Sequence, residues 1–413
     1  MTVALIATHL NPEEQGFYFT FNSIIALQAF VDLGMVSVIQ QFASHERAFL
    51  EWLPNGTLDG LRTHKGRLAS VVRTASRWYG IGAILLAAVL LSAGTFFLSL
   101  RASGTFAWRG QWIAVALFAC AALILTPALA AIEGCGKIAD IARVRTGQSV
   151  AASLAIWAVL LLGGRLWAPV AAAAATFLIA AVYLFRRWRP FLTDLLRTPD
   201  GDLSWREEVW PFQWRTALSW MSSYFIFQMF TPLAFALSGP TDAGRMGLTL
   251  SVANMILSMA MVWLWSKRPL FAITVARREF ATLDALFFPA TLRALVVMIA
   301  GSAAFVAGTF VLGAIGHPWR ARFLPPVPLI LLVLAMLATQ LHWAQATYLR
   351  AHKQEPMLGV RILAAILTAA SAIVFGERWG ATGMMAGFLA VTVVVPLGAG
   401  TLVFIRKRRE WHT

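Results

Sequence analysis

The chain has 413 residues, of which 59% are hydrophobic and only 13% are charged, with a mean hydropathy of +0.70. Soluble globular proteins are about 45–50% apolar and about 25% charged, so these values exclude an ordinary soluble protein. The 34 Lys and Arg residues outnumber the 19 Asp and Glu residues, giving a formal net charge of +15. In a membrane protein this excess holds loops on the cytoplasmic side, so it does not indicate a nucleic-acid partner. The cysteine and histidine spacing predicts no metal site, and we expect no cofactor.

Apolar runs of about twenty residues, the length that a helix needs to cross about 30 Å of hydrocarbon, recur along the chain. Met1–Leu10 forms an apolar fragment too short to cross. Eleven complete spans follow it, at 16–43, 78–100, 111–133, 148–163, 168–185, 216–237, 247–266, 294–315, 327–349, 362–375 and 381–404. The sequence therefore predicts an all-α polytopic membrane protein.

Basic residues are concentrated in alternate loops. If Leu10–Gln15 lies outside, 27 of the 34 Lys and Arg residues lie in inside loops or in the C-terminal tail, and seven lie outside. Because basic loops stay in the cytoplasm, this split predicts short outside loops, long basic inside loops and a cytoplasmic C-terminus.

A faint internal repeat appears when the chain is shifted by 228 residues. Pro12-Glu13-Glu14-Gln15-Gly16 then falls on Pro240-Thr241-Asp242-Ala243-Gly244, and each copy occupies a short outside loop before a long apolar run. The repeat predicts two halves of six spans each, over residues 1–200 and 201–413. The second copy follows a full span, whereas the first follows the short fragment. We therefore expect that upstream codons would complete a first helix.

The most specific motif is Leu10-Asn-Pro-Glu-Glu-Gln-Gly16, followed by Asp32-Leu33-Gly34 and by Gln41-Phe-Ala-Ser-His-Glu46. It resembles the polysaccharide and O-antigen flippases of the multidrug/oligosaccharidyl-lipid/polysaccharide (MOP) superfamily. The resemblance is dense over about 35 residues, and Trp379-Gly-Ala-Thr-Gly383 before the last span extends it. The departure is the largely missing first helix, which lines the cavity in that family.

The resemblance implies a MOP/MATE-like fold of two six-helix halves, with about 11–12 transmembrane helices in this chain. It further implies a transporter of the bacterial inner membrane that flips a lipid-diphosphate-linked oligosaccharide to the outer leaflet for polysaccharide biosynthesis. The implied partners are that lipid-linked oligosaccharide, the membrane lipids and polysaccharide-assembly proteins.

Asp32 is the acid placed deep within a predicted span, and Gln28 lies one helical turn before it. Because an ionisable group in hydrocarbon costs at least about 2.5–3.5 kcal/mol, it normally faces a partner or a water-filled cavity. Two interpretations remain open: an ion-coupling site, or a structural acid bonded to a neighbouring side chain.

Two polar groups are candidates for the substrate headgroup. Arg215, Ser219 and Ser222 form a stripe at the start of the span 216–237, and His342 and Gln345 lie one turn apart in the span 327–349. A cation and hydroxyl groups are what a diphosphate needs. The alternatives are an arginine that extends to the interface and amides that join helices.

Two other functions remain alternatives. A drug or cation exporter of the same superfamily should have a more acidic cavity. A membrane glycosyltransferase or polysaccharide polymerase could use Glu13 and Glu14 as catalytic acids, but every outside connection is about ten residues or shorter. No catalytic motif stands at usable spacing, so we expect a protein that is not an enzyme.

Overall fold

The computed structural model describes residues 1–102, 106–352 and 354–412, except for the side chains of Pro211, Phe212, Arg215 and His412. The chain folds into two compact units. The first unit comprises Met1–Leu10 and Phe21–Tyr224, and the second comprises Asn11–Thr20 and Phe225–Thr413. The predicted division at residues 200 and 201 stays a prediction.

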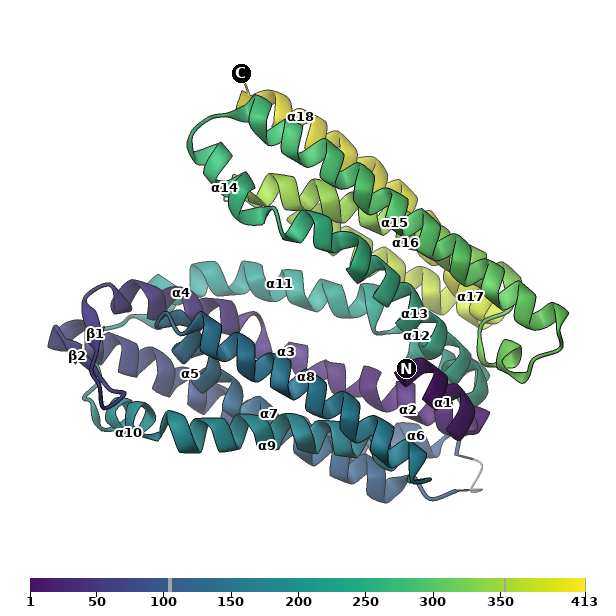
Figure 1. Ribbon diagram of the computed structural model, residues 1–413, viewed down its shortest axis with the longest axis horizontal. Coiled ribbons are helices and arrows are strands. Elements are labelled where there is room, and N and C mark those ends of the chain that lie inside the picture. The colour runs from purple at the N-terminus through teal and green to yellow at the C-terminus, as the bar shows by residue number, and fades with distance from the viewer. Residues whose placement is uncertain (103–105, 353, 413) are drawn as a thin grey trace. The chain divides into compact units, whose positions relative to one another are not determined.

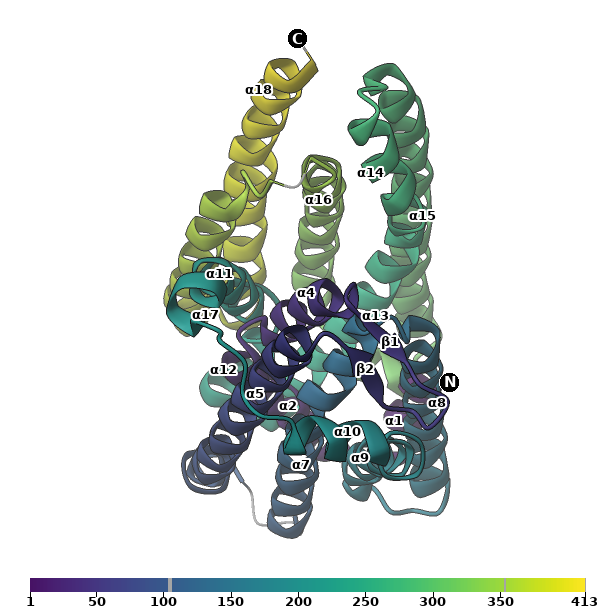
Figure 2. The same ribbon diagram turned by 90° about the vertical axis from the view of Figure 1, so that its left-hand side faces the viewer.

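The first unit contains helices and one short hairpin (Figure 1). Its elements are α1 (Thr2–His9), the end of α2 (Pro12–Ile25), η1 (Ala26–Gln28), α3 (Ala29–Asp32), α4 (Met35–Arg47), β1 (Leu50–Trp52), β2 (Leu58–Gly60), α5 (Arg62–Val89), η2 (Leu90–Gly94), α6 (Thr95–Ser99), α7 (Arg109–Gly134), α8 (Ile138–Leu161), α9 (Trp167–Arg187), α10 (Arg189–Arg197), η3 (Trp205–Val209) and most of α11 (Trp210–Phe227). The strands pair antiparallel, with Leu50 opposite Gly60. Figure 2 shows the hairpin and α10 at one end of this unit, where α10 packs on α5 and α9.

The second unit contains helices and no strand among its described residues. Besides the start of α2 and the end of α11, it contains α12 (Phe230–Ser238), α13 (Pro240–Trp265), α14 (Arg268–Ala276), α15 (Phe280–Ala314), η4 (Pro318–Arg322), α16 (Pro326–Arg350), α17 (Leu358–Thr392), η5 (Val393–Ala399) and α18 (Gly400–His412).

The fold is the predicted all-α polytopic membrane fold. Among the described residues, eight helices are long and apolar enough to span a membrane, or nine if one bent pair is a single span. The longest of these helical segments, Leu358–Trp411, contains two predicted spans. Gly380 within it has non-helical dihedral angles (φ 55°, ψ −140°), and after this residue Gly387 lies close to Ser371 and Phe375. The chain therefore folds back at Gly380.

Two predicted continuous spans are broken in the structure. The run 216–237 divides into α11 and α12, and the run 16–43 bends by 42° between α3 and α4. Leu33 and Gly34 have positive φ angles of 44° and 71° at this bend, so the α-helical hydrogen bonding cannot continue through them. Hydropathy alone could not reveal either break.

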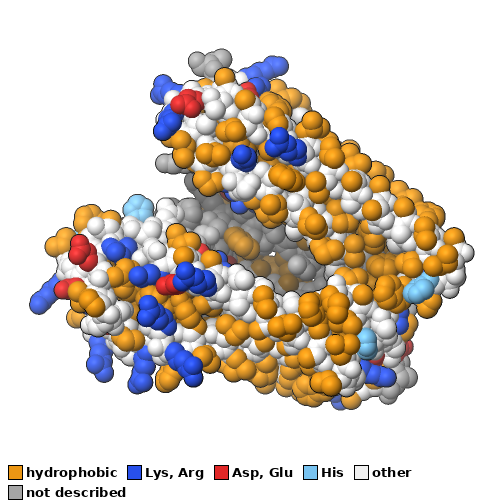
Figure 3. Space-filling view, viewed as in Figure 1, with side chains coloured by type: hydrophobic (Ala, Val, Ile, Leu, Met, Phe, Trp, Pro, Cys, Tyr) orange, Lys and Arg blue, Asp and Glu red, His pale blue; other side chains and the backbone are white. Residues whose placement is uncertain are grey.

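The exterior of each unit is apolar along the helices. Ile84 and Leu85 on α5 are 70% and 61% exposed, and Leu292 on α15 is 62% exposed, as expected for side chains that face lipid. Figure 3 shows this hydrophobic cover, and it shows Lys and Arg side chains gathered at the end of the first unit that carries α10 and the hairpin.

The repeated Pro-x-acid-x-Gly motif forms the first turns of α2 and α13, not loops as predicted. Asn11 Oδ1 accepts a hydrogen bond from the Glu14 amide (2.8 Å), and Glu14 Oε2 accepts one from the Asn11 amide (2.9 Å). This reciprocal pair caps the start of α2. A Cβ atom on Gly16 would lie 1.9 Å from the Pro240 carbonyl oxygen, so the two copies of the motif cross where only glycine fits.

Candidate functional site

A pocket of about 190 Å³ in the second unit gathers basic and aromatic side chains. It is lined by Trp265, Arg268, His342, Trp343, Ala346, Thr347, Arg350 and Arg361. Three of these eight residues are arginines and none is acidic. The lining therefore has the composition of an anion site with aromatic walls.

Three helix junctions bring the arginines together. Arg268 begins α14 after a gap of two residues from the end of α13, and Pro269 favours the start of a new helix there. Arg350 is the last residue of α16, and Arg361 lies in the first turn of α17. All three lie near the end of α16 that carries Arg350, because α13 packs on α16 and α17 follows α16 after a short connection.

The lining of the pocket carries more positive than negative charge. Arg350 Nε pairs with Glu355 Oε1 at 2.9 Å, and Glu355 itself lies outside the lining. The Arg268 guanidinium lies 5.3 Å from the centre of the Trp265 ring, and within the described part of the chain no carboxylate pairs with it. Guanidinium groups bind phosphate oxygens through two parallel hydrogen bonds, so the pocket suits a phosphate or diphosphate.

His342 contributes a polar edge to this pocket. Its Nδ1 lies 2.8 Å from the Pro396 carbonyl oxygen, and because a carbonyl can only accept, Nδ1 is the donor. When the ring is neutral, this leaves Nε2 as an acceptor. Gln345 does not line the pocket: its Nε2 donates to Thr401 Oγ1 at 2.8 Å, which joins α16 to α18. The structure thus separates the predicted pair.

The other predicted stripe lies on α11. Ser219 and Ser222 are buried, and the Ser222 hydroxyl donates to the Leu218 carbonyl of its own helix at 2.7 Å. The Arg215 side chain lies outside the described residues. The stripe is not part of the arginine pocket and stays a prediction.

Asp32 ends α3 at the bend and is half-buried, not deep within a continuous helix. One carboxylate oxygen accepts from the Tyr79 hydroxyl, and the other accepts from the Gly34 amide at 3.2 Å. Gln28 is exposed, and no hydrogen bond between described residues joins it to Asp32. Both oxygens of the carboxylate therefore accept hydrogen bonds from residues at or beside the bend.

No model of a known protein family matches the sequence, and no curated protein matches it. Solved structures do match. A multidrug resistance MATE family transporter of the MOP superfamily, in an inward-facing conformation, has a TM-score of 0.68 at 15% identity, over 99% of this chain and 94% of that chain. The lipid II flippase MurJ in an inward closed conformation has a TM-score of 0.59 at 12% identity, over 99% and 84%. The chain has the MOP-superfamily fold. A MATE protein in a straight conformation has a TM-score of 0.55 at 16% identity, over 99% and 91%.

The MOP fold brings together residues that the sequence interpretation did not select. Arg268, Arg350 and Arg361 are only three of the 27 Lys and Arg residues predicted to lie on the inside. They are up to 93 positions apart, between 268 and 361, so spacing could not show their convergence. The signal that the sequence does offer is that each lies directly at an end of an apolar run.

Proposed function

We propose that this protein is a transporter that moves a lipid-diphosphate-linked oligosaccharide, an undecaprenyl diphosphate derivative, from the cytoplasmic to the outer leaflet for polysaccharide biosynthesis. The observation that carries the proposal is the convergence of Arg268, Arg350 and Arg361 on one pocket whose lining has no acid. Guanidinium groups would hold the diphosphate while the Trp265 and Trp343 rings contact less polar parts of the substrate.

The polyprenyl tail need not enter the protein, because it can remain in the bilayer. The physical task is then limited to moving a large polar headgroup past the hydrocarbon. The His342 imidazole beside three arginines suits a sugar hydroxyl next to a diphosphate. The fold is shared with the lipid II flippase MurJ, which agrees with a lipid-linked substrate.

A cation exporter on the same fold is less compatible with this pocket. A positively charged drug would meet three guanidinium groups and no carboxylate among the lining residues. An enzyme that uses Glu13 and Glu14 is also less compatible, since the Glu14 carboxylate caps α2 and the residue is only 2% exposed.

We further propose that the protein lies in the bacterial inner membrane with its C-terminus in the cytoplasm, because the excess of basic residues in alternate loops favours that orientation.

The proposal is tested by reconstitution into lipid vesicles. One assay measures translocation of a fluorescent undecaprenyl-diphosphate oligosaccharide, and a second measures uptake of an organic cation. We expect translocation of the diphosphate lipid and no cation transport. Cation transport without lipid translocation would replace the flippase proposal with the exporter interpretation.

A further inference from the structure

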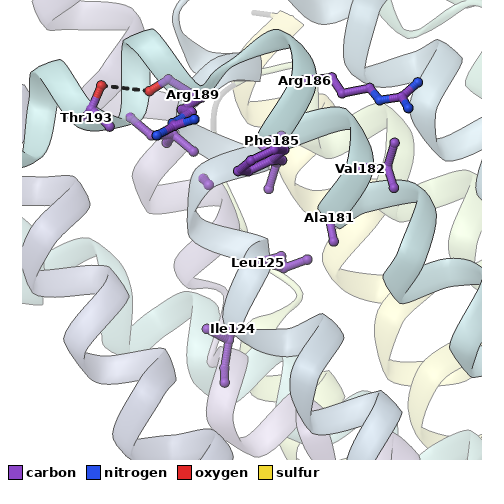
Figure 4. A pocket seen from close by; sticks show the side chains of 11 residues that line it. Ile124, Leu125, Ala181, Val182, Phe185, Arg186, Arg189 and Thr193 are labelled. Atoms are coloured by element: carbon purple, nitrogen blue, oxygen red, sulfur yellow. Dashed lines mark hydrogen bonds between the residues drawn. The ribbon is translucent and has the colours of Figure 1, made fainter.

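A second cavity, in the first unit, is chemically different from the arginine pocket. It is a groove of about 550 Å³ between α7 and α9, closed at one end by α10 (Figure 4). This volume lies within the range of about 300–1,000 Å³ that holds organic ligands. None of its lining residues belongs to the arginine pocket or to the bend at Asp32.

The walls of the groove are apolar and open outward. Ile124 on α7 is 47% exposed, and Val182 and Phe185 on α9 are 49% and 67% exposed. Ala128 and Ala181 add only small side chains, so they leave space between the two helices. Because α7 and α9 are both long and apolar enough to span a membrane, such a groove is open to hydrocarbon chains.

The closed end of the groove is basic. Arg186 lies in the last turn of α9 and Arg189 begins α10; Figure 4 shows both guanidinium groups at the same end of the groove, with Phe185 between them and Ile124 at the other end. Within the described part of the chain, no carboxylate forms an ion pair with either arginine. The Arg189 guanidinium lies 5.3 Å from the centre of the Phe185 ring.

We propose that this groove binds an anionic phospholipid of the bilayer. Its acyl chains lie between α7 and α9, and its phosphate is held by Arg186 and Arg189 where α9 reaches the headgroup region. Charge favours this ligand, because no described carboxylate pairs with either arginine. Position also favours it, because both arginines lie where the apolar groove and the membrane-spanning helix α9 end. Basic pockets between transmembrane helices are suited to acidic headgroups. The site is independent of the transported substrate.

The experiment titrates the full-length purified protein, in detergent, with phosphatidylglycerol or with phosphatidylcholine, and follows the shift of the unfolding temperature. The test variant is Arg186→Gln/Arg189→Gln. The matched control is Arg187→Gln, which removes a neighbouring charge that does not line the groove. A second variant, Ala181→Trp, fills the apolar part, and Arg186→Lys/Arg189→Lys keeps both charges.

We expect phosphatidylglycerol to bind the wild type and Arg187→Gln more tightly than phosphatidylcholine does. The double glutamine variant should bind phosphatidylglycerol about thirtyfold more weakly, because each basic residue near an anionic surface contributes about fivefold. Ala181→Trp should also weaken binding, and the double lysine variant should retain most of it.

Three results would overturn the proposal. They are equal binding of the two phospholipids, an equal loss of affinity for phosphatidylglycerol in Arg187→Gln and in the double glutamine variant, or full stabilisation by inorganic phosphate alone. The last would mean that the arginines bind a free anion. Variants at Arg268 and Arg361 should leave this titration unchanged, so its failure is separable from failure of the proposed transport function.

Discussion

The bend at Asp32 and the arginine pocket both place charged groups at the ends of apolar helices, but they differ in the surroundings of those charges. At the bend, a single carboxylate has both oxygens bonded to neighbours, namely the Tyr79 hydroxyl and the Gly34 amide. In the pocket, three arginines converge on a lining that contains no carboxylate. An ionisable residue whose polar atoms are all bonded to neighbouring residues is thus a weak candidate for binding a ligand. An ionisable residue that shares a cavity with others of like charge is a better candidate.

The largest effect that would sharpen this comparison concerns transport after loss of a pocket arginine. Arg361→Ala should reduce translocation of the diphosphate lipid by about 10- to 150-fold, because a hydrogen bond to a charged group contributes about 1.5–3 kcal/mol. Arg361→Lys should retain part of the activity, since it keeps the charge but loses the two-pronged geometry. The control is Arg293→Ala on α15, which removes an exposed charge away from the pocket. Equal rates for Arg361→Ala and Arg293→Ala at matched expression would remove the pocket from the mechanism.

The second effect concerns the rigidity of the bend. A Cβ atom on Gly34 would lie 2.2 Å from Thr216 Cγ2, and Gly34 has a φ angle of 71°. Gly34→Ala should therefore lower the free energy of unfolding by about 2 kcal/mol or more, through the clash and the left-handed backbone together. Gly136→Ala is the matched control, because Gly136 also has a positive φ (90°) but has open space around its Cβ position. Thermal unfolding of the purified variants measures the difference. Identical losses in both variants would show that contact with α11 does not constrain the bend.

The third effect decides between the two interpretations of Asp32. If the carboxylate is structural, Asp32→Asn should lower the unfolding temperature and transport together, because the amide nitrogen cannot accept the hydrogen bond from the Tyr79 hydroxyl. The cost is about 1–3 kcal/mol. Tyr79→Phe should cost a similar amount, and the double variant should cost less than the sum, since both changes remove one bond. Loss of transport in Asp32→Asn with unchanged stability would instead favour ion coupling and weaken the contrast with the pocket.

The smallest effect concerns the segment that precedes α11. Glu208 pairs with Arg67, and this hydrogen bond lowers the pKa of the Glu208 carboxyl below its ordinary value of 4.5. Because the folded-state pKa is lowered, the stabilisation is present above pH 4.5 and is lost as the pH falls through the lowered pKa. Glu208 is largely exposed, so Glu208→Gln should change stability by less than about 1 kcal/mol at pH 7. The difference from wild type in thermal unfolding should shrink as the pH falls below the ordinary pKa; a constant difference would mean that the pair does not contribute through charge.

Much of the fold could be predicted from the sequence, because hydropathy marks every long helix and glycine marks the fold-back at Gly380. The breaks at Leu33-Gly34 and before Phe230 were not predictable, since apolar residues continue through both and the bend depends on Asp32 and Tyr79 meeting across 47 residues. Of the residues predicted to bind the substrate, only His342 is among those that line the arginine pocket. The arginines that surround it come from three helix ends, and only tertiary structure brings them together.

The measurement that tests the central claim most directly is the affinity of the purified protein for undecaprenyl diphosphate compared with undecaprenol, for the wild type and for Arg268→Gln/Arg361→Gln. If the arginine pocket holds the diphosphate, the wild type should bind the diphosphate lipid at least about tenfold more tightly than the alcohol, a preference that high salt weakens. The double variant should bind the two lipids equally. Equal binding of both lipids by the wild type, or an undiminished preference in the double variant, would contradict a role of the pocket in holding the diphosphate.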